Sequence, residues 1–359
     1  MLLRLLARNR LAQDSGAVAR FLPISRGSTM TTDYAAWGWP QGKGLQGLKL
    51  IRKPLPRPAA HELLVANTAI ALNPVDWKMI EWGPDDWSDG HVPGVDGAGV
   101  IVAAGSAVPM RPGTRVAYHQ ALNRDGSFAE YSLIDARCAI ALPDALDDAL
   151  AAALPCPGLT ALQALDKLPQ GGTEDVLVVG AGGAVGNLLV QMAVQQGFRV
   201  WASASPAHHE ALLSAGVTGV LDYHRQGWQN ELQSRLGLRR LHALFDTVSG
   251  EHAAGLAPLL GYNGHLVCIQ DRQETAPLPA FSTALSLHEV ALNSVHAHGS
   301  ESDWRAYQRN GTALLKQVAE GQLKPSALLP FSFAELPEKL RSLKDGERVG
   351  KWVARLQNA

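Results

Sequence analysis

The feature of this sequence that most restricts its fold is the stretch at residues 175–191, Asp-Val-Leu-Val-Val-Gly-Ala-Gly-Gly-Ala-Val-Gly-Asn-Leu-Leu-Val-Gln. Its first apolar run, residues 176–179, predicts a strand of a parallel sheet that is covered on both faces. The glycines let the backbone turn sharply and approach an anionic group, toward which free N–H groups at a helix start point. A turn that binds nothing is the alternative, but together these features favour a dinucleotide. Its predicted contacts are Gly180, Gly182, Gly183, Ala184, Val185 and Gly186.

The composition excludes several classes of protein. A chain of 359 residues with 46% hydrophobic and 18% charged residues predicts a globular protein of two domains. The net charge of −1 gives no reason to expect nucleic acid or an anionic membrane as a partner, and no apolar run is long enough to span a bilayer. The cysteines are widely spaced, odd in number and without a CxxC pair, which fits a reducing, cytoplasmic setting. They are Cys138, Cys156 and Cys268.

Residues 1–29 differ from the rest of the chain because they carry five arginines and a single acidic residue, Asp14. This composition resembles a mitochondrial targeting segment. The alternative, which we favour, is a start codon assigned too early, with Met30 as the first residue. In both cases we expect an extension that is flexible and lies outside the fold.

Two hydrophobic periodicities divide the remaining chain. Short runs broken by proline and glycine predict strands of a β-rich or barrel-like unit, at residues 48–52, 62–72, 99–105, 115–118 and 128–131. Strand and helix patterns then alternate after residue 158. They predict strands at residues 199–203, 217–221, 242–246, 264–270 and 290–295. They predict helices at residues 160–168, 207–214, 228–236, 251–260 and 304–320.

The alternation predicts an α/β fold with a doubly wound parallel sheet and right-handed crossovers. A helix is also expected at residues 144–154, and an amphipathic helix at residues 331–343 precedes a last strand, residues 351–356. We expect this strand to return to the β-rich domain. The predicted domains are residues 30–157 with 298–359, and residues 158–297 between them.

Four motifs in this order resemble the medium-chain dehydrogenase/reductase superfamily, in its zinc-independent, zeta-crystallin-like quinone oxidoreductase branch. They are Asn73-Pro-Val-Asp-Trp-Lys78, Pro93-Gly-Val-Asp-Gly-Ala-Gly99, Pro155-Cys-Pro-Gly-Leu-Thr-Ala161 and the glycines at 180, 183 and 186 in GxxGxxG spacing. The resemblance covers residues 45–357. It implies a GroES-like catalytic domain, a Rossmann domain, and a homodimer formed near residues 290–295.

The resemblance also indicates how a zinc-dependent alcohol dehydrogenase would differ. The positions that resemble its catalytic zinc ligands are Asn73, Val95 and Cys156, of which only the cysteine is a good ligand. Val75 stands where that branch has a proton-relaying hydroxyl, and the lobe that holds a second zinc is absent between residues 102 and 131. We therefore predict no metal. A zinc-dependent alcohol dehydrogenase is one alternative, and a non-catalytic nucleotide-binding relative is another.

Without a metal, the chemistry that remains is hydride delivery to an electrophilic small molecule, a quinone or an α,β-unsaturated carbonyl. We assign polar roles beside the acceptor to Asn73 and Lys78 and place Thr160 close to the nicotinamide. For Asn73, turn chemistry beside Pro74 is the alternative, and for Lys78 it is a solvated surface position.

The cofactor is predicted to be NADPH. An NAD preference would show as an acid at the end of the second strand, about 20 residues beyond the glycine turn. The first acid there is Glu210, and no Arg or Lys lies between Arg199 and Arg225, which leaves NADH as the alternative. The candidate contacts of the 2′-phosphate are Ser203, Ser205, His208 and Tyr223.

Overall fold

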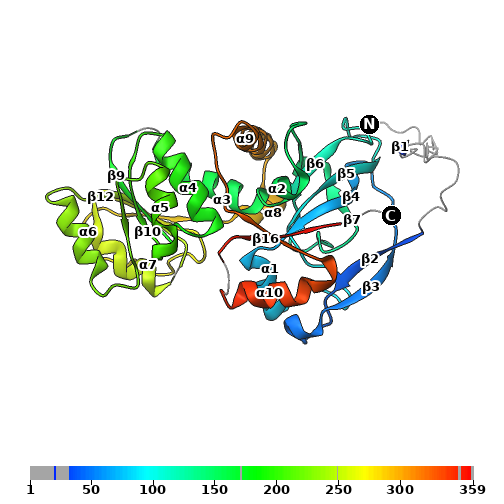
Figure 1. The fold of residues 1–359 in the computed structure, drawn as a ribbon, viewed down its shortest axis with the longest axis horizontal. Coiled ribbons are helices and arrows are strands. Elements are labelled where there is room, and N and C mark those ends of the chain that lie inside the picture. The colour runs from blue at the N-terminus through cyan, green and yellow to red at the C-terminus, as the bar shows by residue number, and fades with distance from the viewer. Residues whose placement is uncertain (1–19, 22–31, 170–171, 249, 347–348, 357–359) are drawn as a thin grey trace, which may run out of the picture.

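The computed structural model describes residues 20–21, 32–169, 172–248, 250–346 and 349–356. Their backbone forms two sheet-based units joined through a central group of helices (Figure 1). One unit holds a mixed, largely antiparallel sheet, and the other a parallel sheet with helices on both faces. The predicted α/β fold class is thereby confirmed. The extension predicted at residues 1–29 lies outside the described residues, except for Arg20–Phe21.

The mixed sheet has the strand order β15-β16-β4-β5-β6-β8, and β7 also pairs with β4. Its long central pair, β4 and β5, is antiparallel and almost wholly buried, as its Val, Ile and Ala content demands. Strand β16 pairs antiparallel with β4, so the end of the chain lies in this sheet. The strands are β4 (Glu62–Ala71), β5 (Asp96–Ala104), β6 (Arg115–His119), β7 (Tyr131–Asp135), β8 (Ala139–Ala141), β15 (Leu328–Phe331) and β16 (Lys351–Arg355). Beside it lie the hairpin β2 (Asp33–Gly38) with β3 (Lys49–Pro54), and β1 (Arg20–Phe21) on the edge of β5.

The parallel sheet has the order β11-β10-β9-β12-β13-β14, which is the 3-2-1-4-5-6 order of a Rossmann domain. Alternate residues of β9 face two separate cores: Val178 packs with α4, and Leu177 packs with α6 and α7. The strands are β9 (Asp175–Val179), β10 (Arg199–Ser203), β11 (Gly219–Leu221), β12 (Leu241–Asp246), β13 (Leu260–Cys268) and β14 (Ser286–Glu289). The helices are α4 (Ala184–Gln195), α5 (His209–Ser214), α6 (Trp228–Leu236) and α7 (Glu251–Leu256).

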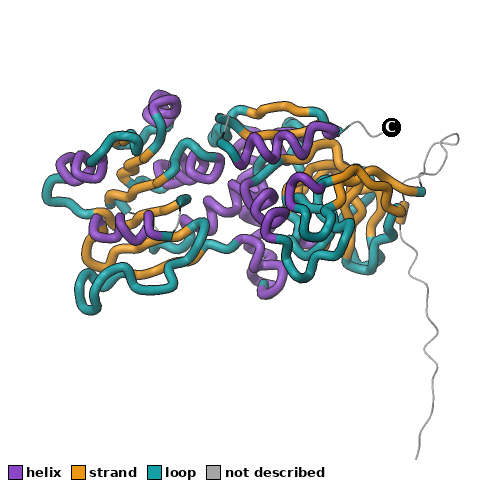
Figure 2. The backbone as a smooth tube through the Cα atoms, turned by 90° about the horizontal axis from the view of Figure 1, so that it is seen from below, coloured by secondary structure: helices purple, strands orange, loops and turns teal. Residues whose placement is uncertain are grey.

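Helix α3 (Pro155–Leu165) connects the two units and packs between α4 and α9 (Glu301–Ala319) (Figures 1 and 2). The contact with α9 is close because Gly158 has no side chain: a Cβ there would lie 2.3 Å from Cδ2 of Leu314. Ser300 starts α9 with a capping box that includes Asp303. The other helices are α1 (Pro74–Trp82), α2 (Asp148–Ala152), α8 (Val295–His298) and α10 (Leu336–Lys344).

The strand predicted at residues 290–295 is wrong. Strand β14 ends at Glu289, and the following residues form a 3-10 turn, Leu292–Ser294, and then α8. The side chain of Asn293 explains the change, because its Oδ1 accepts a hydrogen bond of 3.0 Å from the backbone N–H of Leu122 in the other unit. This contact draws the segment away from the sheet edge.

Several helix boundaries also differ from the prediction. Helix α7 ends at Leu256, and a short 3-10 segment that contains Pro258 leads into β13, because proline cannot continue the backbone ladder. Helix α10 begins only at Leu336, since Phe331 belongs to β15. Within the described ranges, no helix is both long and apolar enough to cross a membrane.

Candidate active site

A cavity of ≈ 680 Å³ lies between the two units, at the carboxyl ends of the parallel strands. In an open doubly wound sheet this is the place where ligands bind, outside the point at which the strand order reverses. One wall is the glycine loop after β9, and the opposite wall comes from α1, α3 and the start of β16. The cavity therefore joins the predicted dinucleotide contacts to the predicted catalytic residues.

The glycine loop has the geometry that anion binding requires. Gly180 directly follows β9 and has a φ of 72°, a conformation that side-chain-bearing residues rarely adopt. Gly183 then begins α4 without a side-chain cap, so the first N–H groups of this twelve-residue helix are available to a ligand. All six loop residues that the sequence predicts line the cavity, namely Gly180, Gly182, Gly183, Ala184, Val185 and Gly186. These residues fit the pyrophosphate of a dinucleotide.

Three of the four predicted 2′-phosphate contacts also line the cavity: Ser205, His208 and Tyr223. His208 lies directly against the loop, because a Cβ on Gly182 would meet its ring at 2.4 Å. Burial lowers the pKa of His208, which keeps its imidazole neutral. Ser203 is placed elsewhere: its side chain is fully buried inside the sheet and does not line the cavity.

The opposite wall is a buried hydrogen-bond network around Asn73. Its Nδ2 donates to Oδ2 of Asp96 at 2.9 Å, and Oδ1 of Asp96 accepts from the backbone N–H of Cys156 at 3.0 Å. Asn73 is also the N-cap of α1, where its backbone N–H donates to Asp76 Oδ2 at 2.6 Å. The turn chemistry expected beside Pro74 therefore occurs, and it holds Asn73 in the cavity wall.

Burial disfavours the ionised form of the acidic groups in this wall. Burial raises the pKa of both Asp76 and Asp96 to about 7, against the hydrogen bonds and the positive charge of Lys351, which lower it. Burial also raises the pKa of Cys156 well above its usual range, so this side chain is a thiol. His119, on the same wall, has its pKa lowered by burial to about 3 and is neutral.

This donor set does not fit a catalytic zinc ion. Zinc is bound by thiolate sulfur, unprotonated imidazole nitrogen or carboxylate oxygen, and the three corresponding positions offer an amide engaged with Asp96, the alkyl group of Val95 and the single sulfur of Cys156. Among the described residues, no group of three or more His, Cys, Asp or Glu side chains is arranged to hold a metal.

The structure brings the other predicted catalytic residues to the same cavity. Thr160 lies on α3 beside Cys156, and Lys78 lies on α1. The Lys78 ammonium is half-buried, donates a hydrogen bond to Oε1 of Gln270, and has its pKa lowered by burial. Lys78 is thus a partly exposed residue at the edge of the cavity, and both its role beside the acceptor and the solvated surface position stay predictions.

Sequence reasoning missed several cavity residues, above all Lys351. Its ammonium donates a hydrogen bond to Oδ1 of Asn73, 278 positions away in the chain. His119, Gln270 and Asn293 were missed as well, since each belongs to a segment without a recognisable motif. For Lys351 a weak signal existed: a lysine that opens a terminal strand directly after Gly350.

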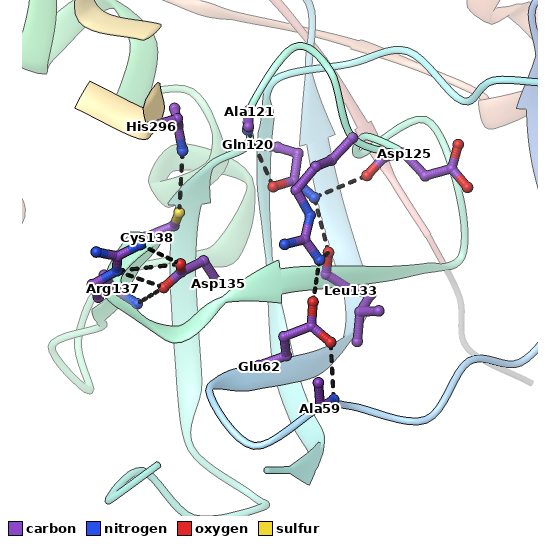
Figure 3. Close-up of polar contacts among 11 residues, drawn as sticks. Ala59, Glu62, Gln120, Ala121, Asp125, Leu133, Asp135, Arg137, Cys138 and His296 are labelled. Atoms are coloured by element: carbon purple, nitrogen blue, oxygen red, sulfur yellow. Dashed lines mark hydrogen bonds and ion pairs between the residues drawn. The ribbon is translucent and has the colours of Figure 1, made fainter. Parts of the chain in front are cut away.

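A second cavity of ≈ 440 Å³ lies beyond Leu122 and Asn293, which line both cavities. Its two arginines already have carboxylate partners. Arg124 pairs with Glu62 at 2.5 Å, and Arg137 pairs with Asp135 at 2.7 Å (Figure 3). The two guanidinium groups of the second cavity are therefore already engaged by carboxylates.

Comparison with known proteins gives the family. Residues 59–144 match the family model of the alcohol dehydrogenase GroES-like domain, and residues 215–353 match that of a zinc-binding dehydrogenase. Quinone-oxidoreductase QR1, chloroplastic, from Triphysaria versicolor is 30% identical over 326 residues, which are 87% of this chain and 95% of that protein. The chain belongs to the medium-chain dehydrogenase/reductase superfamily. The predicted quinone oxidoreductase branch and the GroES-like and Rossmann domains are confirmed.

Two further relatives show the range of this superfamily. Trans-enoyl reductase tndF from Aspergillus flavipes is 35% identical over 211 residues, 54% of this chain and 61% of that protein. The solved structure described as a putative zinc-dependent alcohol dehydrogenase from Rhizobium etli CFN 42 has a TM-score of 0.82, with 30% identity over 91% of this chain and 99% of that one. This chain is an NAD(P)H-dependent oxidoreductase.

Proposed function

We propose that this protein is an NADPH-dependent, metal-free reductase of quinones or α,β-unsaturated carbonyls. The observation that carries the proposal is that one cavity joins the glycine loop to the buried polar wall of Asn73, Asp96 and Cys156. When bound, the nicotinamide would supply a hydride. The protein then needs to exclude water, orient a conjugated acceptor and stabilise negative charge on its oxygen.

The choice of NADPH rests on the groups at the end of β10. Ser205, His208 and Tyr223 offer a hydroxyl, an imidazole and a phenol to a 2′-phosphate, and no acidic residue precedes Glu210 in this region. A carboxylate there would repel the phosphate. The carboxylates that do line the cavity are elsewhere: Asp271 follows β13, and Glu289 is the last residue of β14.

The choice of an electrophilic acceptor rests on what the polar wall lacks. Oxidation of a simple alcohol needs a metal or a base to hold an alkoxide, and Val75 and Val95 offer neither. A conjugated carbonyl needs only hydrogen-bond donors near its oxygen. The names of relatives such as tndF, a trans-enoyl reductase, and QR1, a quinone oxidoreductase, agree with this class.

Initial rates test the proposal. Purified protein, treated with a chelator, is given NADPH or NADH with a panel of quinones, enals, enones and simple ketones. We expect NADPH oxidation with quinones or conjugated carbonyls only, and a clear preference for NADPH. Activity with alcohols that chelation abolishes would identify the zinc-dependent alternative. Binding of NADPH without turnover of any acceptor would identify the non-catalytic one.

We further propose that the protein is a cytoplasmic homodimer. In the described part of the chain β14 is the last strand of the parallel sheet, and its outer edge has no partner strand. An edge of this kind can pair with the same strand of a second copy. Light scattering after size exclusion measures the mass, and a monomer would contradict the proposal.

A further inference from the structure

Lys351 is a cation held inside the protein. It opens β16, its side chain is only 5% exposed, and it lines the cavity beside Asn73. Moving an ammonium out of water costs several kcal/mol unless charge and hydrogen bonds compensate it. A lysine is rarely retained at such a position for packing alone.

Those contacts leave the ammonium partly unsatisfied. Within the described residues its single hydrogen-bond acceptor is the neutral Oδ1 of Asn73, and no carboxylate oxygen lies within the 4.0 Å of an ion pair. An ammonium has three N–H donors, so two have no hydrogen-bond acceptor among the described residues. A buried cation with spare donors in a cavity wall is a site for an oxygen that carries negative charge.

The neighbouring carboxyl groups of Asp76 and Asp96 accept their hydrogen bonds from groups other than Lys351, although the positive charge of Lys351 acts on both. Asp76 accepts from the backbone N–H groups of Asn73 at 2.6 Å and Val95 at 3.1 Å. Asp96 accepts from the Asn73 amide at 2.9 Å and from the backbone of Cys156 at 3.0 Å. Both therefore fix the backbone and the Asn73 amide, and Asn73 in turn fixes Lys351.

We propose that Lys351 is a catalytic residue whose ammonium stabilises the negative charge that develops on the acceptor's oxygen, with Asn73 and Asp96 as positioning residues. This inference rests on the proposed reductase function. It names Lys351 as the group that stabilises the acceptor's oxygen, a role that a metal ion has in zinc-dependent enzymes. It also explains why Asn73 and Cys156 can occupy ligand-like positions without a metal, since a fixed cation already stands beside Asn73.

The reaction balances with this assignment. The conjugated carbon gains a hydride, the π electrons of the C=C bond move onto the carbonyl oxygen, and NADPH becomes NADP⁺. A proton from solvent then reaches the α-carbon as the carbonyl re-forms. Lys351 forms and breaks no bond in this scheme, and its contribution is electrostatic. Preorganised donors in a water-excluded site contribute about 10²–10³-fold each to such a step.

Lys78 is the competing candidate for this role, because it lines the same cavity. Its ammonium already donates to Gln270 and is only half-buried, so more of its charge is screened by water. We assign Lys78 to the entrance of the cavity and expect its loss to raise KM more than it lowers kcat.

Charge removal tests the assignment. Lys351→Met keeps the length of the side chain but not its charge, Lys351→Arg keeps the charge, and Lys324→Met removes the charge of an exposed lysine as a control. We expect kcat to fall about 100-fold or more in Lys351→Met with little change in KM for NADPH, to recover partly in Lys351→Arg, and to stay unchanged in Lys324→Met. If Lys351→Met fails to fold, Lys351→Gln replaces it, since Gln keeps a donor for Asn73.

A binding measurement separates this inference from the proposed function. 4-Nitrophenol changes its absorption spectrum on ionisation, so its spectrum when bound reports whether the site stabilises an oxyanion. We expect bound phenolate in the wild type and in Lys351→Arg, and neutral phenol in the uncharged variants. If the wild type turns over an acceptor and the kcat of Lys351→Met is within about threefold of the wild-type kcat, the role of Lys351 is overturned and the proposed reductase function stands. Lysine-dependent phenolate binding without any turnover would support the anion site while the proposed function fails.

Discussion

A Cβ at Gly186 would lie 2.4 Å from the carbonyl oxygen of Gly180, inside the distance that any two non-bonded heavy atoms accept. Gly186 lies in the first turn of α4, and Gly180 directly follows β9, so the missing side chain lets helix and strand meet closely. Because the contact is with backbone, relief of a clash would have to move the helix start itself. The amides that face the cavity would move with it.

Gly186→Ala is therefore expected to lower the free energy of unfolding by about 1–3 kcal/mol and to weaken NADPH binding at least about tenfold. Urea denaturation and cofactor titration by fluorescence measure the two effects. Gly255→Ala is the control: this exposed helical glycine has no atom within 4 Å of an added Cβ. It should raise stability by about 0.5–1 kcal/mol without changing cofactor affinity. Equal behaviour of the two variants would contradict the packing explanation.

The parts of the fold that sequence predicted are those whose physical signal is local. The run at 176–179 and the glycine spacing after it reported β9, the turn and α4 because burial and backbone freedom are written into neighbouring residues. The alternation of strand and helix after residue 158 is local in the same sense. Asn73, Thr160 and Lys78 were found through short motifs, and all three line the cavity.

The parts that sequence missed depend on contacts between distant segments. Lys351 opens a terminal strand, where a lysine is ordinarily exposed, and only pairing of β16 with β4 carries it to Asn73. Residues 290–295 have strand composition, but Asn293 binds the backbone of Leu122 and a turn forms instead. Ser203 is the last residue of β10, and its side chain is fully buried and does not line the cavity.

Asp175 holds the base of the parallel sheet and should be a main contributor to its stability. It is 1% exposed and accepts hydrogen bonds from Arg199 at 2.9 Å, Arg239 at 3.0 Å and the Trp201 indole at 2.8 Å. Removal of the Asp175 charge leaves the two guanidinium groups and the indole N–H without a negatively charged acceptor. Because both arginines are partly exposed and can be hydrated, we expect Asp175→Asn to cost about 2–3 kcal/mol, below the 3–5 kcal/mol of a fully buried pair.

Urea denaturation of Asp175→Asn checks this value, and Glu231→Gln supplies the comparison. Glu231 pairs with Arg235 on the surface of α6 at a spacing of four residues, a contact worth about 0.3–0.5 kcal/mol. A cost for Asp175→Asn as small as that of the surface pair would show that the cluster does not anchor the sheet.

His119 should make the protein less stable in acid. It is buried, its Nδ1 has no hydrogen-bond partner among the described atoms, and its ring stacks on His296. Burial lowers its pKa from 6.5 to about 3, so between these values the unfolded chain binds a proton that the folded chain does not. Stability from this group is therefore complete above pH 6.5 and falls as the pH drops toward 3, by up to about 1.4 kcal/mol per pH unit.

The comparison of wild type with His119→Phe isolates this effect, because phenylalanine keeps the stacking and cannot titrate. Asp76 and Asp96 act in the opposite sense: burial raises their pKa to about 7, so their contribution decreases as the pH rises from about 4 through 7. They are common to both proteins and cancel in the difference. Urea denaturation from about pH 4 to pH 7 should give a smaller acid loss in His119→Phe; parallel curves would contradict it.

Ser205 offers the sharpest test of cofactor choice. It lines the cavity at the end of β10, and its side chain makes no capping bond to the turn that follows, so a substitution leaves the local backbone intact. Ser205→Asp places a negative charge where a 2′-phosphate is expected and gives the free ribose hydroxyls of NADH an acceptor. We expect the ratio of kcat/KM for NADPH to that for NADH to fall at least about tenfold, equivalent to about 1.4 kcal/mol.

Ser234→Asp, on the exposed face of α6, makes the same change in net charge away from the cavity and should leave the ratio unaltered. A ratio that stays constant in Ser205→Asp would mean that the adenosine phosphate lies elsewhere, and a ratio that changes equally in both variants would mean that net charge, not position, governs cofactor choice.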